Sequence, residues 1–376
     1  MNIDIEKDYF IRALSCAANG EALETPSEEL DWKRFFGLCK FHDVVNTVYF
    51  AIKDCENVPE NVIRKFEEYF FITVAKQADE EHILKQIEAR LAKLNIDLAY
   101  LKGKVIRELY PCKEMRYSSD IDILIRPENC EKVSQVMACL GFNQTFSGVN
   151  EDIYKKEPYL NIEFHKTLLS PITKVSRVYD YDFSKTRKVR DNIYKLSDND
   201  LFIHTLVHIV QHMENGGIGV RFFLDIYLMK KNLRLDENYI KVNLEKYGLY
   251  EFYQNVIKLC SMWFSGKQGD ETTLDFAQFV LNSGTYGTSA SEYITYTDEK
   301  GGHPLLNRIF PPANVISFRY PIVLKKPYLL PFYQFKRLFE IKSPFGKLKA
   351  YFSSDKRNQI DMAVSTQKDL YSRIGL

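Results

Sequence analysis

The sequence lacks any stretch of about 18 uncharged apolar residues, so it predicts no helix that spans a membrane. It also lacks an excess of one charge: 51 basic and 50 acidic residues leave +1, so overall charge alone does not bind the chain to nucleic acid. It contains no HExxH motif and no CxxC pair, and its seven cysteines are scattered. The first eight residues are too acidic for a secretory signal peptide. We therefore expect reduced thiols and a cytoplasmic protein.

What is present is typical of a globular protein, with 45% apolar and 27% charged residues. The 376 residues suggest two or three domains. We expect an α+β protein in which a small mixed β-sheet domain lies between two helical regions. The expected boundaries are residues 1–95 for an N-terminal helical bundle, 96–197 for the mixed domain and 198–376 for a C-terminal helical region.

The N-terminal region shows helical periodicity and no recognisable chemistry. From Val58 to Leu94, apolar residues recur at helical spacing. Pro59 suits a first helical turn, and Glu60 suits its positive end. This run exceeds a typical globular helix, so we expect either a break near residues 77–79 or one long spine.

Strand-like runs begin after Asn95. We expect strands at residues 96–101, 118–125, 152–156, 159–164 and 193–196, and a helix from about 126 to 140. Gly141 follows that helix in the position where a left-handed cap is common. The segment 96–197 is therefore a small mixed α/β unit.

Two carboxylates in the strand at 118–125 are the strongest chemical signal. Side chains two residues apart on a strand point the same way, so Asp120 and Asp122 share one face while Ile121 and Ile123 share the other. At about 4 Å, two such charges repel by roughly 4 kcal/mol at an effective dielectric of 20. A divalent cation reverses the sign of that interaction, and Mg²⁺ prefers oxygen ligands and substrate phosphates. An alternative is two surface aspartates at a strand end.

A third acidic residue, Glu163, lies in the later run Asn161-Ile162-Glu163-Phe164-His165. If that strand lies beside the first, three carboxylates converge, which is enough for one or two metal ions.

These motifs carry a resemblance that covers most of the chain. The matching residues are Leu101-Lys102-Gly103, Tyr110-Pro111, Arg116, Ser119 to Ile125, Leu140-Gly141-Phe142, Ile162 to His165, His208, and Phe223 to Ile226. The chain resembles the nucleotidyltransferase superfamily with the DNA-polymerase-β-type palm, and more narrowly the bacterial group of uncharacterised nucleotidyltransferases.

The resemblance implies transfer of a nucleotide from an NTP to an unknown acceptor, with Mg²⁺ or Mn²⁺ as cofactor. It implies that Asp120, Asp122 and Glu163 are the catalytic and metal-binding residues, with Glu163 as an alternative general base. Substrate-binding roles then fall to Lys102, Gly103, Lys104, Arg116, Ser119 and His165. For Lys102 and Arg116, a solvated lysine and an ion pair with a strand aspartate are the alternatives.

Weaker signals lie in the C-terminal region. His204, His208 and His212 mark one row of a helix, which favours a polar face near the mixed domain over a metal site. Asp225 has Arg221 four residues earlier as a possible partner. Basic residues interleaved with aromatics in the segment 319–357 fit either an anionic partner or a solvated helical face.

The second functional hypothesis is a non-catalytic nucleotide-binding or interaction module with a nucleotidyltransferase-like fold. The Gly103-Lys104 turn, where the superfamily usually has Gly-Ser, and the lack of a recognisable acceptor-binding motif favour it.

Overall fold

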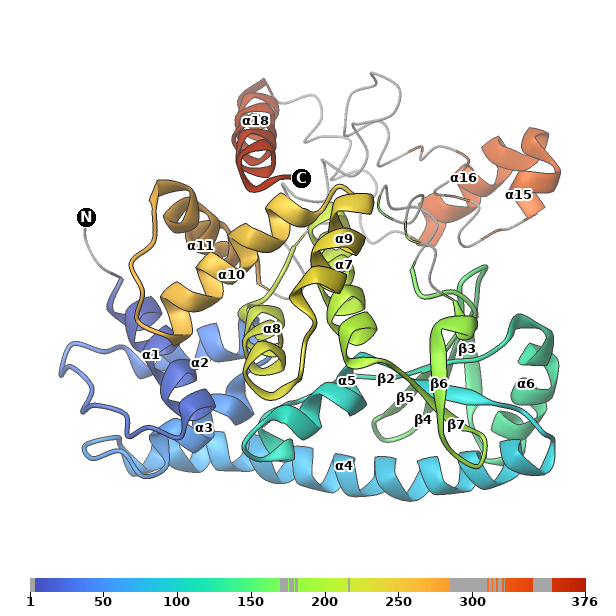
Figure 1. The fold of residues 1–376 in the computed structure, drawn as a ribbon. Coiled ribbons are helices and arrows are strands. Elements are labelled where there is room, and N and C mark those ends of the chain that lie inside the picture. The colour runs from blue at the N-terminus through green and yellow to red at the C-terminus, as the bar shows by residue number, and fades with distance from the viewer. Residues whose placement is uncertain are drawn as a thin grey trace.

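The computed structural model describes residues 4–169, 175, 179, 182–215, 217–284, 310, 313, 316, 320, 322–340 and 354–376 (Figure 1). It combines a seven-stranded mixed sheet with many helices, which is compatible with the predicted α+β architecture. No described helix has the length and apolar character needed to cross a membrane.

The chain begins with four helices, which are α1 (Ile5–Asn19), α2 (Trp32–Phe41), α3 (Val45–Ile52) and α4 (Glu60–Lys93). Asp4 caps α1 by accepting from the amide of Lys7, and Gly20 ends it with φ +70°. The long periodic run is one unbroken spine, α4, which passes beneath both the N-terminal helices and the sheet (Figure 1). Arg90 and Lys93 in its last turn complement the helix dipole.

The sheet has the strand order β3-β4-β5-β2-β1-β7-β6. Its strands are β1 (Leu98–Tyr100), β2 (Ile121–Leu124), β3 (Asn143–Ser147), β4 (Glu151–Lys156), β5 (Leu160–His165), β6 (Thr186–Arg190) and β7 (Ile193–Leu196). The central strand β2 pairs antiparallel with β1 and parallel with β5. Helix α6 (Cys130–Cys139) precedes β3, and Gly141 after it has φ +80°, as the sequence predicted.

The sequence prediction missed β3 and β6, which are the two edge strands of this sheet. Both are largely exposed, so neither shows the alternation of apolar and polar residues that marks a half-buried strand. Charged residues such as Arg187 and Lys188 are common on edge strands, where they discourage pairing with other chains.

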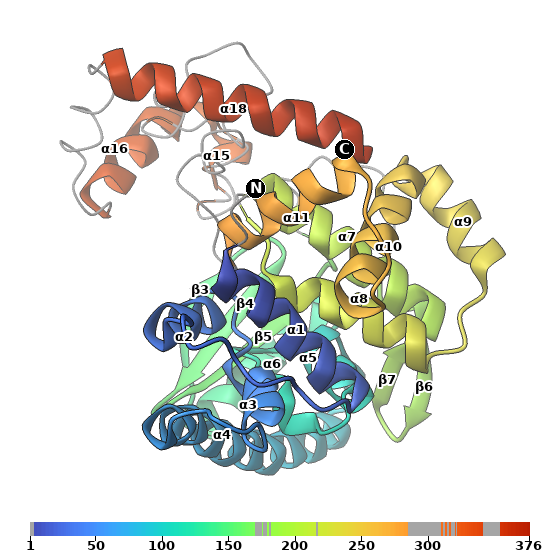
Figure 2. The ribbon, with the colours of Figure 1, turned by 90° about the vertical axis from the view of Figure 1, so that its left-hand side faces the viewer.

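Further helices follow the sheet, namely α7 (Asp198–Asn215), α8 (Val220–Asn232), α9 (Glu237–Lys246), α10 (Tyr250–Phe264), α11 (Glu271–Ser283), α15 (Ile322–Lys325), α16 (Leu330–Glu340) and α18 (Ser354–Ile374). Helix α10 contacts both α8 and the N-terminal α1, and α18 contacts α11 (Figure 2). Residues 319, 321 and 341–353 of the basic segment lie outside the described residues.

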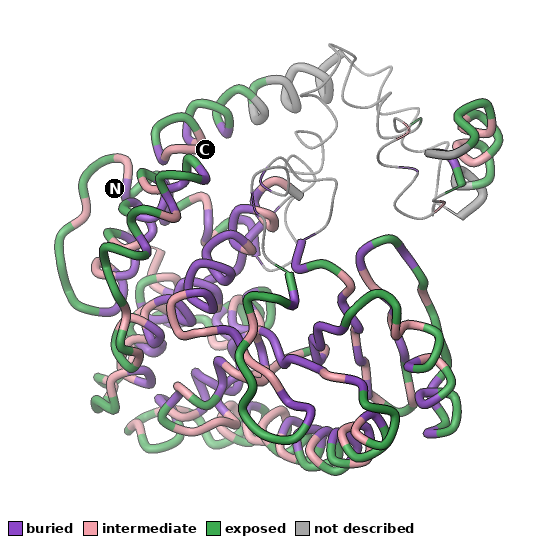
Figure 3. The backbone as a smooth tube through the Cα atoms, turned by 45° about the vertical axis from the view of Figure 1, so that its right-hand side comes forward, coloured by how far each residue is buried: buried purple, intermediate pink, exposed green. Residues whose placement is uncertain are grey.

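Two hydrophobic cores position the site. The larger contains residues of both helical regions, such as Phe10 and Phe223, together with Leu124 of the sheet. The smaller joins the second half of α4 to the sheet and α6, through Ile87, Ile123 and Met137. Buried residues are concentrated in the interior of the fold (Figure 3), and α7 contacts both α8 and strand β7 there. Strand β2 therefore packs into both cores, with Leu124 in the larger one and Ile123 in the smaller one.

Candidate active site

Two adjacent strands place acidic side chains together. In the parallel pair of β2 and β5, Asp122 lies opposite Glu163, and Leu124 lies opposite His165. Ile121 and Ile123 are buried in the smaller core, so the register is held by the apolar face of the strand. The carboxylates consequently share the other face of the sheet.

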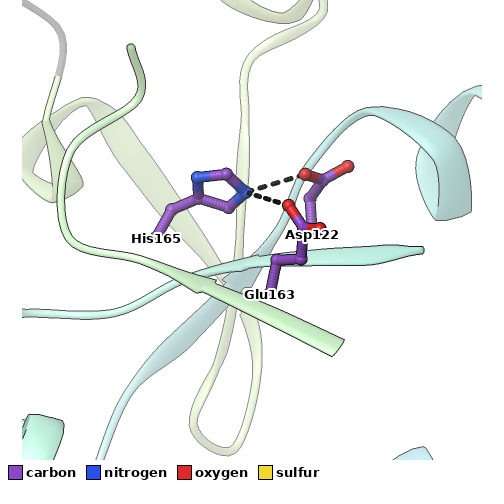
Figure 4. A group of neighbouring side chains, drawn as sticks. All are labelled: Asp122, Glu163 and His165. Atoms are coloured by element: carbon purple, nitrogen blue, oxygen red, sulfur yellow. Dashed lines mark hydrogen bonds and ion pairs between the residues drawn. The ribbon is translucent and has the colours of Figure 1, made fainter. Parts of the chain in front are cut away.

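Asp122, Glu163 and His165 form a compact group with metal-ligand geometry. Each offers one ligand atom, and these atoms all lie within 4.8 Å of one another. His165 Nε2 lies 2.7 Å from Asp122 Oδ1 and 3.9 Å from Glu163 Oε2 (Figure 4). On its other side, His165 Nδ1 lies 3.5 Å from Glu151 Oε2. The sequence analysis assigned His165 to substrate, whereas this geometry places it among the potential ligands.

Asp120 lies on the same cavity but outside that group of three ligand atoms. Burial and the negative charge of Asp122 raise the pKa of Asp120. Asp120 directly precedes β2, and the carbonyls of Ser118 and Ser119 beside it accept hydrogen bonds from Lys76 Nζ at 2.7 and 2.9 Å. A buried lysine of α4 thus holds the segment that presents Asp120.

The three carboxylates ionise unequally. Burial and the charges of Asp120 and Asp122 raise the pKa of Glu163 to about 7. Burial also opposes the ionisation of Asp122, but Lys102 and the hydrogen bond with His165 hold its pKa below the usual range. Such a cluster stores electrostatic repulsion that a divalent cation relieves. The carboxylate oxygens fit Mg²⁺ or Mn²⁺, and an imidazole nitrogen is a common additional ligand of transition metals.

Lys102 lies where β1 ends, at the first residue of the short helix α5 (Lys102–Ile106). Its Nζ lies 3.6 Å from Asp122 Oδ1 and 3.0 Å from His208 Nε2. Its φ of +34° is rare for a residue with a side chain, and such backbone conformations are concentrated at functional sites. Lys102 is therefore a cation held next to the acidic group.

Gly103 is needed because the loop before β2 packs against it. A Cβ at this position would meet Ser118 Oγ at 2.4 Å and Arg116 Nη1 at 3.2 Å. Ser119 is exposed and lines the cavity. Lys104 points elsewhere, with Nζ 5.0 Å from the centre of the Tyr100 ring.

Arg116 is occupied by a buried ion pair. Its Nε and Nη2 donate to the two oxygens of Asp225 at 2.8 and 2.7 Å, and Tyr110 donates to Asp225 Oδ1 at 2.7 Å. Arg221, the possible partner considered from the sequence, instead donates from Nη1 to the carbonyl of Tyr117 at 3.0 Å and lies 3.9 Å from Asp43 Oδ2. The pair with Arg116 joins α8 to the loop that precedes β2.

A cavity of about 280 Å³ connects these groups. It is lined from the sheet side by Lys102, Gly103, Arg116, Ser118, Ser119, Asp120, Asp122, Asn150, Glu151, Glu163 and His165, and from the helical side by Asp43, Thr205, His208, Gln211, His212, Arg221, Phe222 and Asp225 among others. The acidic residues thus face helices α7 and α8 across one space.

Several cavity residues had not been singled out from the sequence. They are Asp43, Asn150, Glu151, Thr205, Gln211 and Phe222, and Arg221 had been considered only as a partner of Asp225. The row of histidines was the available signal for α7. His208 and His212 do line the cavity, whereas His204 is fully buried beside Tyr179. None of these three belongs to the metal-capable group found among the described residues.

Comparison with known proteins identifies a family for most of the chain. The sequence profile of the family described as uncharacterised nucleotidyltransferase matches residues 28–265, a span that contains the sheet and helices α2 to α10. No curated protein and no solved structure matches the chain. Since the match covers more than half of the chain, the protein belongs to the uncharacterised nucleotidyltransferase family.

Proposed function

We propose that the protein transfers a nucleotide from an NTP to an acceptor in the cavity between the sheet and helices α7 and α8. The observation that supports this most directly is the register pairing of Asp122 with Glu163 on the cavity wall, with Lys102 beside them. In a chain of this family, carboxylates and a cation on one cavity wall support a site for a divalent ion and nucleotide phosphates.

A divalent cation, Mg²⁺ or Mn²⁺, would be held by Asp122 and Glu163, with Asp120 or His165 completing the set. When bound, the ion supplies positive charge that offsets the charge developing on the transferred phosphoryl group.

The chain's own residues supply positioning and proton transfer. Lys102 attracts the triphosphate, and Arg221 on the opposite wall adds a second positive charge. Glu163 can also take the proton of an acceptor hydroxyl when it is not engaged as a ligand. Ser119, which is exposed and lines the cavity, would donate to a phosphate oxygen.

The test uses the double variant Asp120→Asn/Asp122→Asn. Purified protein is incubated with Mg²⁺, each NTP and pools of RNA, protein and small-molecule acceptors, and pyrophosphate release is measured. We expect release from the wild type, its loss in the double variant, and wild-type release from the control Asp54→Asn, whose side chain is 84% exposed.

Equal turnover by the double variant would refute the proposal. Calorimetry that detects Mg-NTP binding, without pyrophosphate release for any acceptor, would favour the non-catalytic nucleotide-binding module instead.

A further inference from the structure

Helices α7 and α8 present an aromatic and amide surface to the cavity, and the proposed chemistry leaves this surface unused. His208, Gln211 and His212 are three and four residues apart, so they lie on one face of α7, and Phe222 approaches from α8. All four line the same cavity as the carboxylates.

The rings form a cluster in which neighbouring planes are not parallel: the angle is 49° between His212 and Phe222 and 86° between His208 and His212. The ring centres of His212 and Phe222 are 4.6 Å apart, and those of His208 and His212 are 4.4 Å apart. Burial lowers the pKa of His212 to about 3, and that of His208 also falls well below its ordinary value. Both imidazoles are therefore neutral at pH 7. Neutral aromatic faces are the surfaces on which nucleobases stack.

Gln211 adds a polar group that has no hydrogen-bond partner among the residues that the structure describes. That group is its Oε1, which is buried. A buried acceptor without a hydrogen bond destabilises the folded protein unless a ligand supplies a donor. A glutamine amide donates and accepts side by side, which is the pattern needed to read the edge of a base.

Lys102 lies between this surface and the acidic group. His208 Nε2 lies 3.0 Å from Lys102 Nζ, which in turn lies 3.6 Å from Asp122 Oδ1. His212 is one helical turn, about 5.4 Å, along α7 from His208. The surface and the acidic group therefore lie in one cavity with Lys102 between them, as a base and its phosphates belong to one nucleotide.

We propose that Gln211, His212 and Phe222 form the nucleobase subsite of this cavity, in which the base stacks on the His212 ring beside Phe222 and Gln211 Oε1 accepts from a base N–H. This inference rests on the proposed function, because it takes an NTP as the ligand.

The test compares ligands with and without a base. Equilibrium binding of ATP, GTP, CTP and UTP with Mg²⁺ is measured beside binding of inorganic triphosphate with Mg²⁺. We expect His212→Ala to weaken binding of the NTP that the wild type binds most tightly about tenfold, because stacking is lost. Binding of inorganic triphosphate should not change. His212→Phe keeps a ring and should restore NTP binding.

The amide is tested separately. Gln211→Ala should weaken binding of the most tightly bound NTP about 3- to 10-fold. It should also reduce the differences in affinity among ATP, GTP, CTP and UTP. Thermal unfolding of each variant checks that it is folded, and Gln211→Glu supplies a second variant if Gln211→Ala unfolds.

The outcomes separate the two proposals. Two results overturn the base subsite while the proposed function stands. One is NTP binding that neither the Gln211 nor the His212 variants change, and the other is an equal loss of affinity for triphosphate and NTP. If wild-type protein binds neither NTP nor triphosphate with Mg²⁺, the proposed function itself falls, and the subsite falls with it.

Discussion

Removing one member of the buried Arg116–Asp225 pair should be the most damaging single change near the site. Asp225 is 1% exposed and Arg116 is 5% exposed, and the carboxylate accepts three hydrogen bonds from Arg116 and Tyr110. The variant Asp225→Ala leaves the guanidinium and the phenol hydroxyl without these acceptors.

The expected magnitude follows from burial. Breaking a buried ion pair by removing one partner costs about 3–5 kcal/mol, because the remaining charge is left uncompensated. Replacing both partners with apolar residues of similar size is often close to neutral. We therefore expect Arg116→Met/Asp225→Leu to be clearly more stable than Asp225→Ala.

Urea unfolding followed by fluorescence measures both changes. The two tryptophans, Trp32 and Trp263, pack in the same larger core and report its unfolding. The control is Glu60→Ala, which breaks the exposed pair of Glu60 with Arg64 at 2.9 Å. Exposed pairs of this kind contribute little, so we expect a change within about 0.5 kcal/mol.

Two results would refute this reasoning. One is an Asp225→Ala variant no less stable than Glu60→Ala. The other is a double variant that loses more stability than Asp225→Ala alone, which would show that packing rather than uncompensated charge governs the cost.

Three further predictions follow from the same structure. Lys76→Met removes the donor to the carbonyls of Ser118 and Ser119, so pyrophosphate release should fall about tenfold or more while circular dichroism stays native; unchanged release would contradict this. Burial lowers the pKa of His42 to about 4, whereas the unfolded chain binds that proton near pH 6.5, so the free energy of unfolding should fall by up to about 3 kcal/mol between pH 6.5 and 4. In urea titrations at each pH, the free energy of unfolding of His42→Gln should fall less between pH 6.5 and 4 than that of the wild type. Mg²⁺ or Mn²⁺ at 100 times its Kd should raise the free energy of unfolding by about 2.7 kcal/mol, an effect that chelation reverses and that Asp122→Asn lacks in thermal scans.

Local patterns predicted the elements that are half-buried or strongly periodic. The apolar spacing predicted α4, and the short apolar runs predicted β1, β2, β4, β5 and β7. The exposed edge strands β3 and β6 have no such pattern, and the sequence did not reveal them. The residue types of the acidic group were also visible, because carboxylates between isoleucines in a strand are unusual.

What the sequence by itself determined is which face of each strand carries Asp122 and Glu163, because side chains alternate with a period of two. Only the tertiary structure decided which strands are neighbours, since pairing β2 with β5 joins segments about forty residues apart and no local pattern encodes that choice. It likewise decided that Asp225 pairs with Arg116 and that both helical regions share one core, because burial and charge compensation act across the whole fold.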